Sequence, residues 1–471
     1  MSENNRSIDS SITALKSGVW FAICNIVTKS VGFLTIPIFA RLLTKSEFGN
    51  YNNFTTWTGM ILPITSLNLE SSMICARYDY EEDYDSYVAS MSCLSCLSTL
   101  VWFVLCMIFI VPAQNLLSLN RTEIMAMFLY LLFYPTIQIF QTKERYQYRY
   151  KSTVAITLLV VAGTALLSVV LVILMQNKLE GRIIGTVVPI IIIGLVLLYV
   201  IFKNANGIKL TYWKYALPFT IPFIPHLLSM YLLGSMDKVM IKQICGAEDL
   251  ALYSLAYTVG TIVSLLVTSM NNAFSPWLGE QLSSNNDSKI KKVSVPYVGF
   301  FTFAAICVVL VAPEILLILG GQSYAEARYV IPQIFAGCLM QFIYCMYVNV
   351  EQYEKKTVGM AIASVIAASF NYITNYIFIR KFGYIAASYT TFFSYLLLML
   401  LHIYLANRIG KGNVFDSRKI LLIGALGSAL LISTNVIFDY IIIRYCVFAV
   451  LLICMLVIAY KKRGMIKQFI R

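Results

Sequence analysis

The sequence predicts an all-α integral membrane protein with fourteen transmembrane helices, arranged as two inward-facing six-helix lobes and an extra C-terminal pair. Composition predicts the class. Hydrophobic residues make up 59% of the 471 residues and charged residues only 13%, whereas soluble domains carry roughly 25% charged residues. An internal repeat and the distribution of positive charge predict the arrangement.

The second half of the chain repeats the first at an offset of about 202 residues. Many secondary transporters build a central site between two repeated membrane lobes. The repeat therefore predicts a carrier. The matched residues are Ala14-Leu15 with Ala216-Leu217, Tyr51 with Tyr253, Pro112 with Pro313, and Thr153-Val154 with Thr357-Val358.

A membrane-spanning helix needs about 20 predominantly apolar residues, and fourteen segments meet this requirement. The first is longer than the apolar core of a signal peptide, so we expect it to be a span. The predicted spans are residues 17–40, 49–75, 86–112, 122–142, 152–176, 181–202, 217–242, 250–274, 292–319, 325–350, 356–380, 384–407, 418–437 and 440–461.

The last two spans lie outside the repeat. The longest cytoplasmic loops are 203–216 and the Ser- and Asn-rich stretch 275–291, and no loop is large enough for a soluble catalytic domain. Tyr212, Trp213 and Tyr215 indicate a short interfacial helix before span seven. The expected domains are an N-terminal lobe at 1–202, a cytoplasmic linker at 203–216, a C-terminal lobe at 217–407, and the extra helix pair with a cytoplasmic tail at 408–471.

Positive charge is distributed unevenly across this topology. The side of the termini carries 24 of the 36 Lys and Arg residues and the opposite side ten, and such an excess marks cytoplasmic segments. We therefore expect both termini in the cytoplasm. The distribution also accounts for the net charge of +13 without nucleic acid as a partner.

Lys29 lies near the middle of the first predicted span, where a lipid-facing charge costs at least about 2.5–3.5 kcal/mol. Gly18, Asn25, Lys29 and Gly32 fall on one helical stripe. A polar stripe with a cation at mid-depth is typical of the wall of a water-filled cavity, although a lysine that snorkels or pairs for packing would give the same pattern. The repeat places Tyr231 at the position matching Lys29, so the expected site is asymmetric.

Two further charged pairs lie near the ends of spans. Asp237 and Lys238 are adjacent in span seven, where neighbouring side chains point about 100° apart, so we expect them not to satisfy each other. Glu70 and Arg77 are seven residues apart on one predicted face of span two, and they are candidates for an inner gate or for interface anchors.

Amide and imidazole side chains extend the candidate set into the second lobe. Asn371 and Asn375 are one helical turn apart in span eleven, and amides either bind sugar hydroxyls or hold membrane helices together. Prolines from Pro218 to Pro225 interrupt the start of span seven, and broken helices free backbone groups for ligands. His226 follows them and is a candidate proton-linked residue.

The sequence indicates neither an enzyme nor a cofactor. It contains no G-x-x-x-x-G-K-[ST], no G-x-G-x-x-G after a strand, and no H-E-x-x-H. Cys93 and Cys96 lie in a predicted span without a second pair, so we interpret them as structural thiols rather than metal ligands. The acidic run 79–85 reads as a solvated loop of like charges.

Three stretches of this sequence resemble the polysaccharide flippases of the MOP exporter superfamily, the Wzx-type carriers of O-antigen and capsule repeat units. The resemblance covers essentially the whole chain, and its motifs specify junctions rather than chemistry. The stretches are Ile36–Tyr51 at the junction of spans one and two, Asp237-Lys238 with Tyr253–Tyr257, and Asn371 and Asn375 with Gly383–Ser388.

The resemblance implies alternating access, in which a sugar repeat unit on undecaprenyl diphosphate enters from the cytoplasm and leaves on the outer face of a bacterial inner membrane. The diphosphate requires cations, and Lys29 is the first choice, with Arg41, Arg77 and Lys238 as further candidates. The lipid tail would stay in the bilayer. A glycan polymerase and a chain-length regulator are the expected partners.

Other functions remain open. Drug/cation antiporters of the same superfamily resemble twelve-span proteins with deep acidic residues, whereas this chain has a deep lysine. A lipid II flippase matches the topology better, but more buried arginines are expected there. A membrane-embedded glycan polymerase or ligase would require a large outer loop, and a purely structural scaffold explains neither Lys29 nor the repeat.

Overall fold

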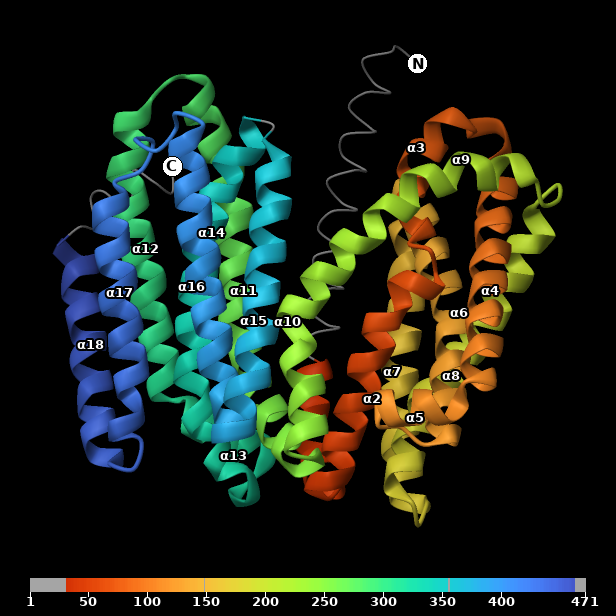
Figure 1. Cartoon of the computed structure of the whole chain (residues 1–471), viewed down its shortest axis with the longest axis horizontal. Coiled ribbons are helices and arrows are strands. Elements are labelled where there is room, and N and C mark those ends of the chain that lie inside the picture. The colour runs from red at the N-terminus through yellow and green to blue at the C-terminus, as the bar shows by residue number, and fades with distance from the viewer. Residues whose placement is uncertain (1–30, 148, 355, 462–471) are drawn as a thin grey trace. The chain divides into compact units, whose positions relative to one another are not determined.

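The computed structural model describes residues 31–147, 149–354 and 356–461, and every regular element among them is a helix (Figure 1). The all-α membrane class is confirmed. Among the described residues, ten helices are long and apolar enough to cross a membrane, and the segments Leu210–Ser229 and Gly234–Ile244, bent by 58°, count as an eleventh only if they form one span. Two apolar stretches, Val31–Leu42 and Ile441–Ile453, lie at the ends of the described region. The count of fourteen and the repeat remain predictions.

The chain forms two compact units, Met1–Ala251 and Leu252–Arg471. Helix α10 packs against α2, so the segment predicted as span seven belongs by its contacts to the first unit. The predicted lobe boundaries at 202 and 217 remain predictions derived from the repeat.

In the first unit, α8 packs against α6 and α7, and α4 packs against α6. Small residues permit these close approaches: a Cβ on Gly185 would lie 2.3 Å from the Cα of Ser168, so only glycine lets α8 approach α7 at this point. The helices are 31–42, α2 (Lys45–Thr65), α3 (Met73–Asp79), α4 (Tyr84–Ile108), α5 (Ile110–Leu117), α6 (Arg121–Tyr146), α7 (Tyr150–Leu174), α8 (Lys178–Asn204), α9 (Leu210–Thr220), α10 (Ile224–Ile244) and the start of α11 (Ala247–Ser283).

In the second unit, α14 is the central helix, because α12, α16 and α17 all pack against it. Helix α15 contacts mainly α16, and most of its other side chains are exposed. Helices α17 and α18, which correspond to the extra C-terminal pair, both pack on α12. The helices after α11 are α12 (Asp287–Leu310), α13 (Ala312–Gly320), α14 (Ile331–Tyr353), α15 (Thr357–Phe382), α16 (Tyr384–Arg408), α17 (Ser417–Ser433) and α18 (Ile441–Lys461).

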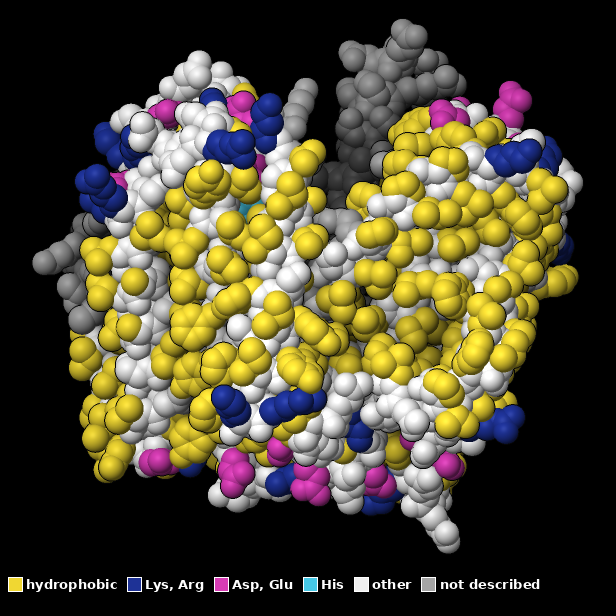
Figure 2. Space-filling view, in the orientation of Figure 1, with side chains coloured by type: hydrophobic (Ala, Val, Ile, Leu, Met, Phe, Trp, Pro, Cys, Tyr) yellow, Lys and Arg dark blue, Asp and Glu magenta, His cyan; other side chains and the backbone are white. Residues whose placement is uncertain are grey.

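The surface agrees with a bilayer environment. On the visible face, each unit carries a band of hydrophobic side chains between two ends where charged side chains gather (Figure 2). Many of these hydrophobic side chains are large and exposed, including Leu166 and Leu174 on α7 and Val358 on α15. Exposure of such side chains to lipid carries no hydrophobic penalty, because acyl chains are as apolar as leucine.

Several predicted segments are divided or extended in the structure. The prediction of one continuous span at 49–75 is wrong: α2 ends at Thr65, two residues after Pro63, and Leu67 and Asn68 adopt left-handed conformations with φ of 52° and 49°. The predicted loop 275–291 is also wrong, because α11 continues to Ser283. Five short helical segments lie between the longer helices, namely Leu69–Ser72 (η1), Glu81–Asp83 (η2), Ile221–Phe223 (η3), Gln322–Val330 (η4) and Thr434–Ile437 (η5).

Candidate functional site

The principal candidate, Lys29, and its neighbour Asn25 lie outside the described residues, as does the side chain of His226. Their roles remain predictions. Of the other candidates, Arg41 lies at the end of helix 31–42 with an exposed side chain.

Glu70 and Arg77 do not lie in one continuous α-helix, because the short helix η1 ends at Ser72 and α3 begins at Met73. Glu70 lies in η1 and Arg77 in α3. Arg77 Nη1 is 3.3 Å from Glu81 Oε1, four residues later, and the charge acting on Glu70 is that of Arg145 on α6. The expected geometry for this pair is therefore wrong, and their gating role remains a prediction.

Asp237 and Lys238 lie in α10, within the first unit. Asp237 is buried and Lys238 is half-buried. Asp237 Oδ1 accepts a hydrogen bond from the backbone N–H of Lys238 at 2.8 Å, and the same carboxylate is the charge that acts on the lysine. This hydrogen bond joins the carboxylate to the backbone of Lys238, so the expectation that the two side chains do not satisfy each other remains a prediction.

Asn371 and Asn375 are fully buried and hold α15 against α16. Asn375 donates to Asn371 Oδ1 at 3.0 Å and accepts from Thr390, and Asn371 donates to Thr391 Oγ1 at 3.4 Å. Both threonines lie in α16. These bonds satisfy the amides between helices, which favours the packing interpretation over sugar contact in this conformation.

Arg182 was not among the sequence candidates, yet it has the most unusual environment of any described cation in the first unit. It lies in the second turn of α8, and its Cζ is 3.6 Å from the ring centroid of Phe39 and 4.4 Å from that of Tyr51. Its Nε is buried without a hydrogen-bond acceptor. Among the described residues, no acidic side chain forms an ion pair with it.

Three elements build this aromatic enclosure of Arg182. Phe39 comes from helix 31–42, Tyr51 from α2, and Arg182 from α8. Lys178 Nζ donates to the carbonyl of Leu42 at 2.9 Å and joins the end of helix 31–42 to α8. Thr186, one turn after Arg182, lies 3.0 Å from the Tyr51 hydroxyl. The spacing of Arg182 and Thr186 was visible in the sequence, but their helix was predicted to begin only at residue 181.

The energetic balance at Arg182 is unfavourable without a ligand. Arg182 is half-buried, so each cation–π contact is worth between about 0.5 and 2 kcal/mol, and partial removal from water costs part of the several kcal/mol of a fully buried ion. An orphaned donor adds about 1–3 kcal/mol. Two rings therefore offset only part of the cost of this cation.

A line of polar groups leads from Arg182 through the first unit. Tyr51 interacts electrostatically with Tyr130 on α6, whose ring stacks on that of Tyr134 at 4.9 Å between centroids. Tyr134 in turn interacts with Glu70, the residue beside Arg145. These groups come from α2, η1, α6 and α8, so the line is a product of helix packing.

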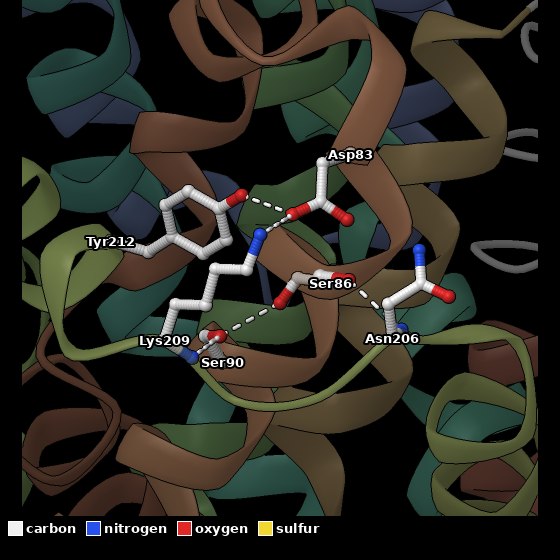
Figure 3. Close-up of polar contacts among 6 residues, drawn as sticks. All are labelled: Asp83, Ser86, Ser90, Asn206, Lys209 and Tyr212. Carbon is white, nitrogen blue, oxygen red and sulfur yellow. Dashed lines mark hydrogen bonds and ion pairs between the residues drawn. The ribbon is translucent and has the colours of Figure 1, made fainter.

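The acidic run 79–85 is not a solvated loop, as expected from its composition, but the anchor of α9 (Figure 3). Lys209 Nζ lies 2.5 Å from Asp83 Oδ2, and Tyr212 donates to the same oxygen. The backbone N–H groups of Asn206 and Lys209 donate to Ser86 and Ser90, each at 3.0 Å. The ion pair raises the pKa of Lys209. This contact confirms the short helix predicted before span seven.

The second unit contains two ion pairs with a deeply buried member. His402 Nδ1 on α16 lies 2.9 Å from Glu351 Oε1 on α14, with both side chains almost completely buried. Arg444 on α18 donates to both carboxylate oxygens of Glu314 on α13 and to the carbonyl of Leu310. The second pair joins the extra C-terminal helices to the rest of the unit.

Comparisons with known proteins agree with this architecture. Two curated relatives from Haemophilus influenzae, "Lsg locus putative protein 1" and an "Uncharacterized membrane protein", are each 22% identical to this chain; the first match covers 75% of the chain and 88% of the relative, the second 76% and 88%. The solved structure of the lipid II flippase MurJ in an inward closed conformation has a TM-score of 0.69 at 13% identity and covers 95% of this chain and 100% of that one.

An inward-facing multidrug resistance MATE family transporter of the MOP superfamily has a TM-score of 0.59 at 14% identity, covering 84% of this chain and 98% of that one. These likenesses show the fold. The sequence profile of the MatE family matches residues 222–377, and that of the polysaccharide biosynthesis protein family matches residues 14–282, more than half of the chain. The chain is therefore a multi-pass membrane transporter of the MOP superfamily and belongs to its polysaccharide biosynthesis protein family.

Proposed function

We propose that this protein moves an undecaprenyl-diphosphate-linked oligosaccharide repeat unit from the cytoplasmic to the outer face of a bacterial inner membrane by alternating access. The match of the polysaccharide biosynthesis profile to residues 14–282 carries the proposal. The excess of Lys and Arg on the side of the termini supports cytoplasmic termini.

Cations supply the chemistry for the diphosphate. Lys29, with Asn25 on the same stripe, would hold the head group, assisted by Arg41, Lys238 and Arg77. Arg77 must first release Glu81, and their exposed i,i+4 ion pair is weak. Binding of the diphosphate at these cations in one conformation and its release in another would suffice for carriage.

The remaining candidates would act during the conformational change. Glu70 and Asp237 are each proposed to form an ion pair with a basic side chain at a gate. His226 is the proposed proton-linked residue. Asn371 and Asn375 would reach sugar only in a state in which α15 separates from α16.

The test is complementation of a strain that lacks its own repeat-unit flippase. Lys29→Ala should abolish surface glycan and cause the lipid-linked repeat unit to accumulate, at unchanged protein level, and Lys29→Arg should retain part of the activity. Lys203→Ala, an exposed lysine at the end of α8, is the matched control and should complement fully. Normal glycan with Lys29→Ala would remove Lys29 from the mechanism, and failure of the wild type to complement with any repeat unit would remove the function.

A lipid II flippase is the second candidate, because the likeness to MurJ extends over 95% of the chain, including the C-terminal helices, against 84% for the MATE transporter. Growth of cells depleted of their own lipid II flippase distinguishes the two. Rescue of growth would favour this candidate, and absence of rescue together with restored glycan would favour repeat-unit export.

A further inference from the structure

We propose that Arg182 forms a binding site for a lipid-borne phosphate group, at the end of the first unit where helix 31–42, α2 and α8 meet. The inference rests on the proposed function, because it assigns a second phosphate-binding residue for that class of substrate. It concerns a residue in the second turn of α8, which the structure places beside the rings of Phe39 and Tyr51.

The first argument is geometric. A ring stacked over a guanidinium takes up its face and none of its N–H donors, which all lie in its plane. Two side chains bond to Arg182, and both use its carbonyl, which accepts from Thr186 at 2.9 Å and from Ser168 at 3.5 Å. Its buried Nε has no acceptor. The fork of donors is therefore held by two aromatic rings and remains available to an oxyanion.

The second argument concerns charge. The group that acts electrostatically on Arg182 is the Tyr51 hydroxyl and not a carboxylate, so the cation has no acidic partner in the described part of the chain. Planar bidentate recognition by arginine suits a phosphate. A phosphate bound here would supply both the missing acceptor and the missing negative charge.

The third argument is the surroundings of the site. The polar line through Tyr51, Tyr130 and Tyr134 offers hydroxyl groups beyond the guanidinium, which can donate to further phosphate oxygens or contact sugar hydroxyls. Glu70 lies at the far end of this line.

Two lipids carry this chemistry: an isoprenoid diphosphate, as in the proposed substrate, and an anionic phospholipid. The purified full-length protein in phosphatidylcholine nanodiscs is titrated with farnesyl diphosphate and, separately, with short-chain phosphatidylglycerol. Farnesyl diphosphate should bind the wild type, and Arg182→Gln should weaken it about 10- to 100-fold, the loss expected for charge-assisted hydrogen bonds. Arg182→Lys should fall between, because it keeps the charge and loses the fork.

Arg121→Gln is the matched control, since Arg121 is an exposed arginine at the first position of α6, and its affinity should equal that of the wild type. A loss confined to phosphatidylglycerol identifies a phospholipid as the occupant and still supports a lipid-phosphate site. Absence of binding by either lipid to the wild type, or equal binding by wild type and Arg182→Gln, overturns the inference. The complementation assay tests the proposed function independently of this result.

Melting without ligand separates this role from a structural one. If the only role of Arg182 is to hold three helices together through its contacts with the two rings, Arg182→Gln lowers the melting temperature. The inference then fails even if binding is reduced. If the cation is kept for a ligand, the unliganded variant melts at the same temperature as the wild type or higher, because an unpaired cation has been removed.

Discussion

Ionisable side chains inside the second unit are paired, whereas Arg182 in the first unit has aromatic neighbours and no acidic partner among the described residues. His402 with Glu351 and Arg444 with Glu314 each join two helices. Breaking a buried pair leaves an uncompensated charge, so such pairs fix helices in place. A cation without a partner contributes little to holding helices and is suited to a charge that arrives with a ligand.

The contrast between the two units bears on the asymmetry that the sequence predicts for the site. The repeat places Tyr231 where the first lobe has Lys29, and in the structure Tyr231 donates to the carbonyl of Thr56 on α2 at 3.0 Å. It therefore makes a packing contact. The predicted repeat would preserve helix positions and not the partners of each charge, so two repeated lobes would be able to differ in function.

The largest effect should come from His402→Phe, which keeps the ring beside Tyr344 and removes the partner of Glu351. We expect a loss of about 3 kcal/mol in unfolding free energy, the lower end for breaking a buried pair, because the other carboxylate oxygen already has no hydrogen bond. Thermal denaturation in detergent measures it. The double variant His402→Phe/Glu351→Leu should recover most of the loss, and a double variant as unstable as the single one would contradict a pairing role.

A smaller effect is expected for Asn375→Ala on α15. It removes the hydrogen bonds to Asn371 and Thr390 and should cost about 1 kcal/mol, the usual value for a polar contact between membrane helices. Export per folded molecule should stay unchanged if the amide holds α15 against α16 throughout the transport cycle. Loss of export at a normal protein level would instead place Asn375 at the substrate and would weaken the contrast between the two units.

The smallest effect should come from Asp83→Asn at the anchor of α9. We expect a fall in melting temperature of about 1 °C, because exposed ion pairs are weak, and a smaller fall in 1 M salt, which screens the pair. Asp83 raises the pKa of Lys209, so the lysine contribution is fully present below its ordinary value of 10.5 and is lost only as the pH rises through the raised pKa. The difference between variant and wild type should thus stay constant from pH 7 to pH 9, and a marked change in that range would contradict the assignment.

The sequence predicted the polar candidates unevenly. Helix periodicity assigns faces along one helix, so Asn371 and Asn375 were correctly placed on a common face. It fails where a helix is interrupted. Glu70 and Arg77 have helical spacing, but the left-handed residues Leu67 and Asn68 end the predicted span before both of them. The two residues then lie in different elements, Glu70 in η1 and Arg77 in α3. The acidic run 79–85 reads as solvated because its partners, Lys209, Tyr212 and Lys143, are more than 50 residues away in sequence.

The sequence by itself determined that this chain is an all-α membrane protein, because apolar length acts locally and needs no knowledge of neighbours. Its resemblance to a flippase family came from motifs at helix junctions and not from apolar length or charge. Only the tertiary structure decided which charges are paired. The acidic partner of Arg444, the imidazole beside Glu351 and the rings around Arg182 all come from helices distant in sequence. The physical reason is that the cost of a charge in a bilayer depends on what lies within a few ångströms of it, and helix packing sets that environment.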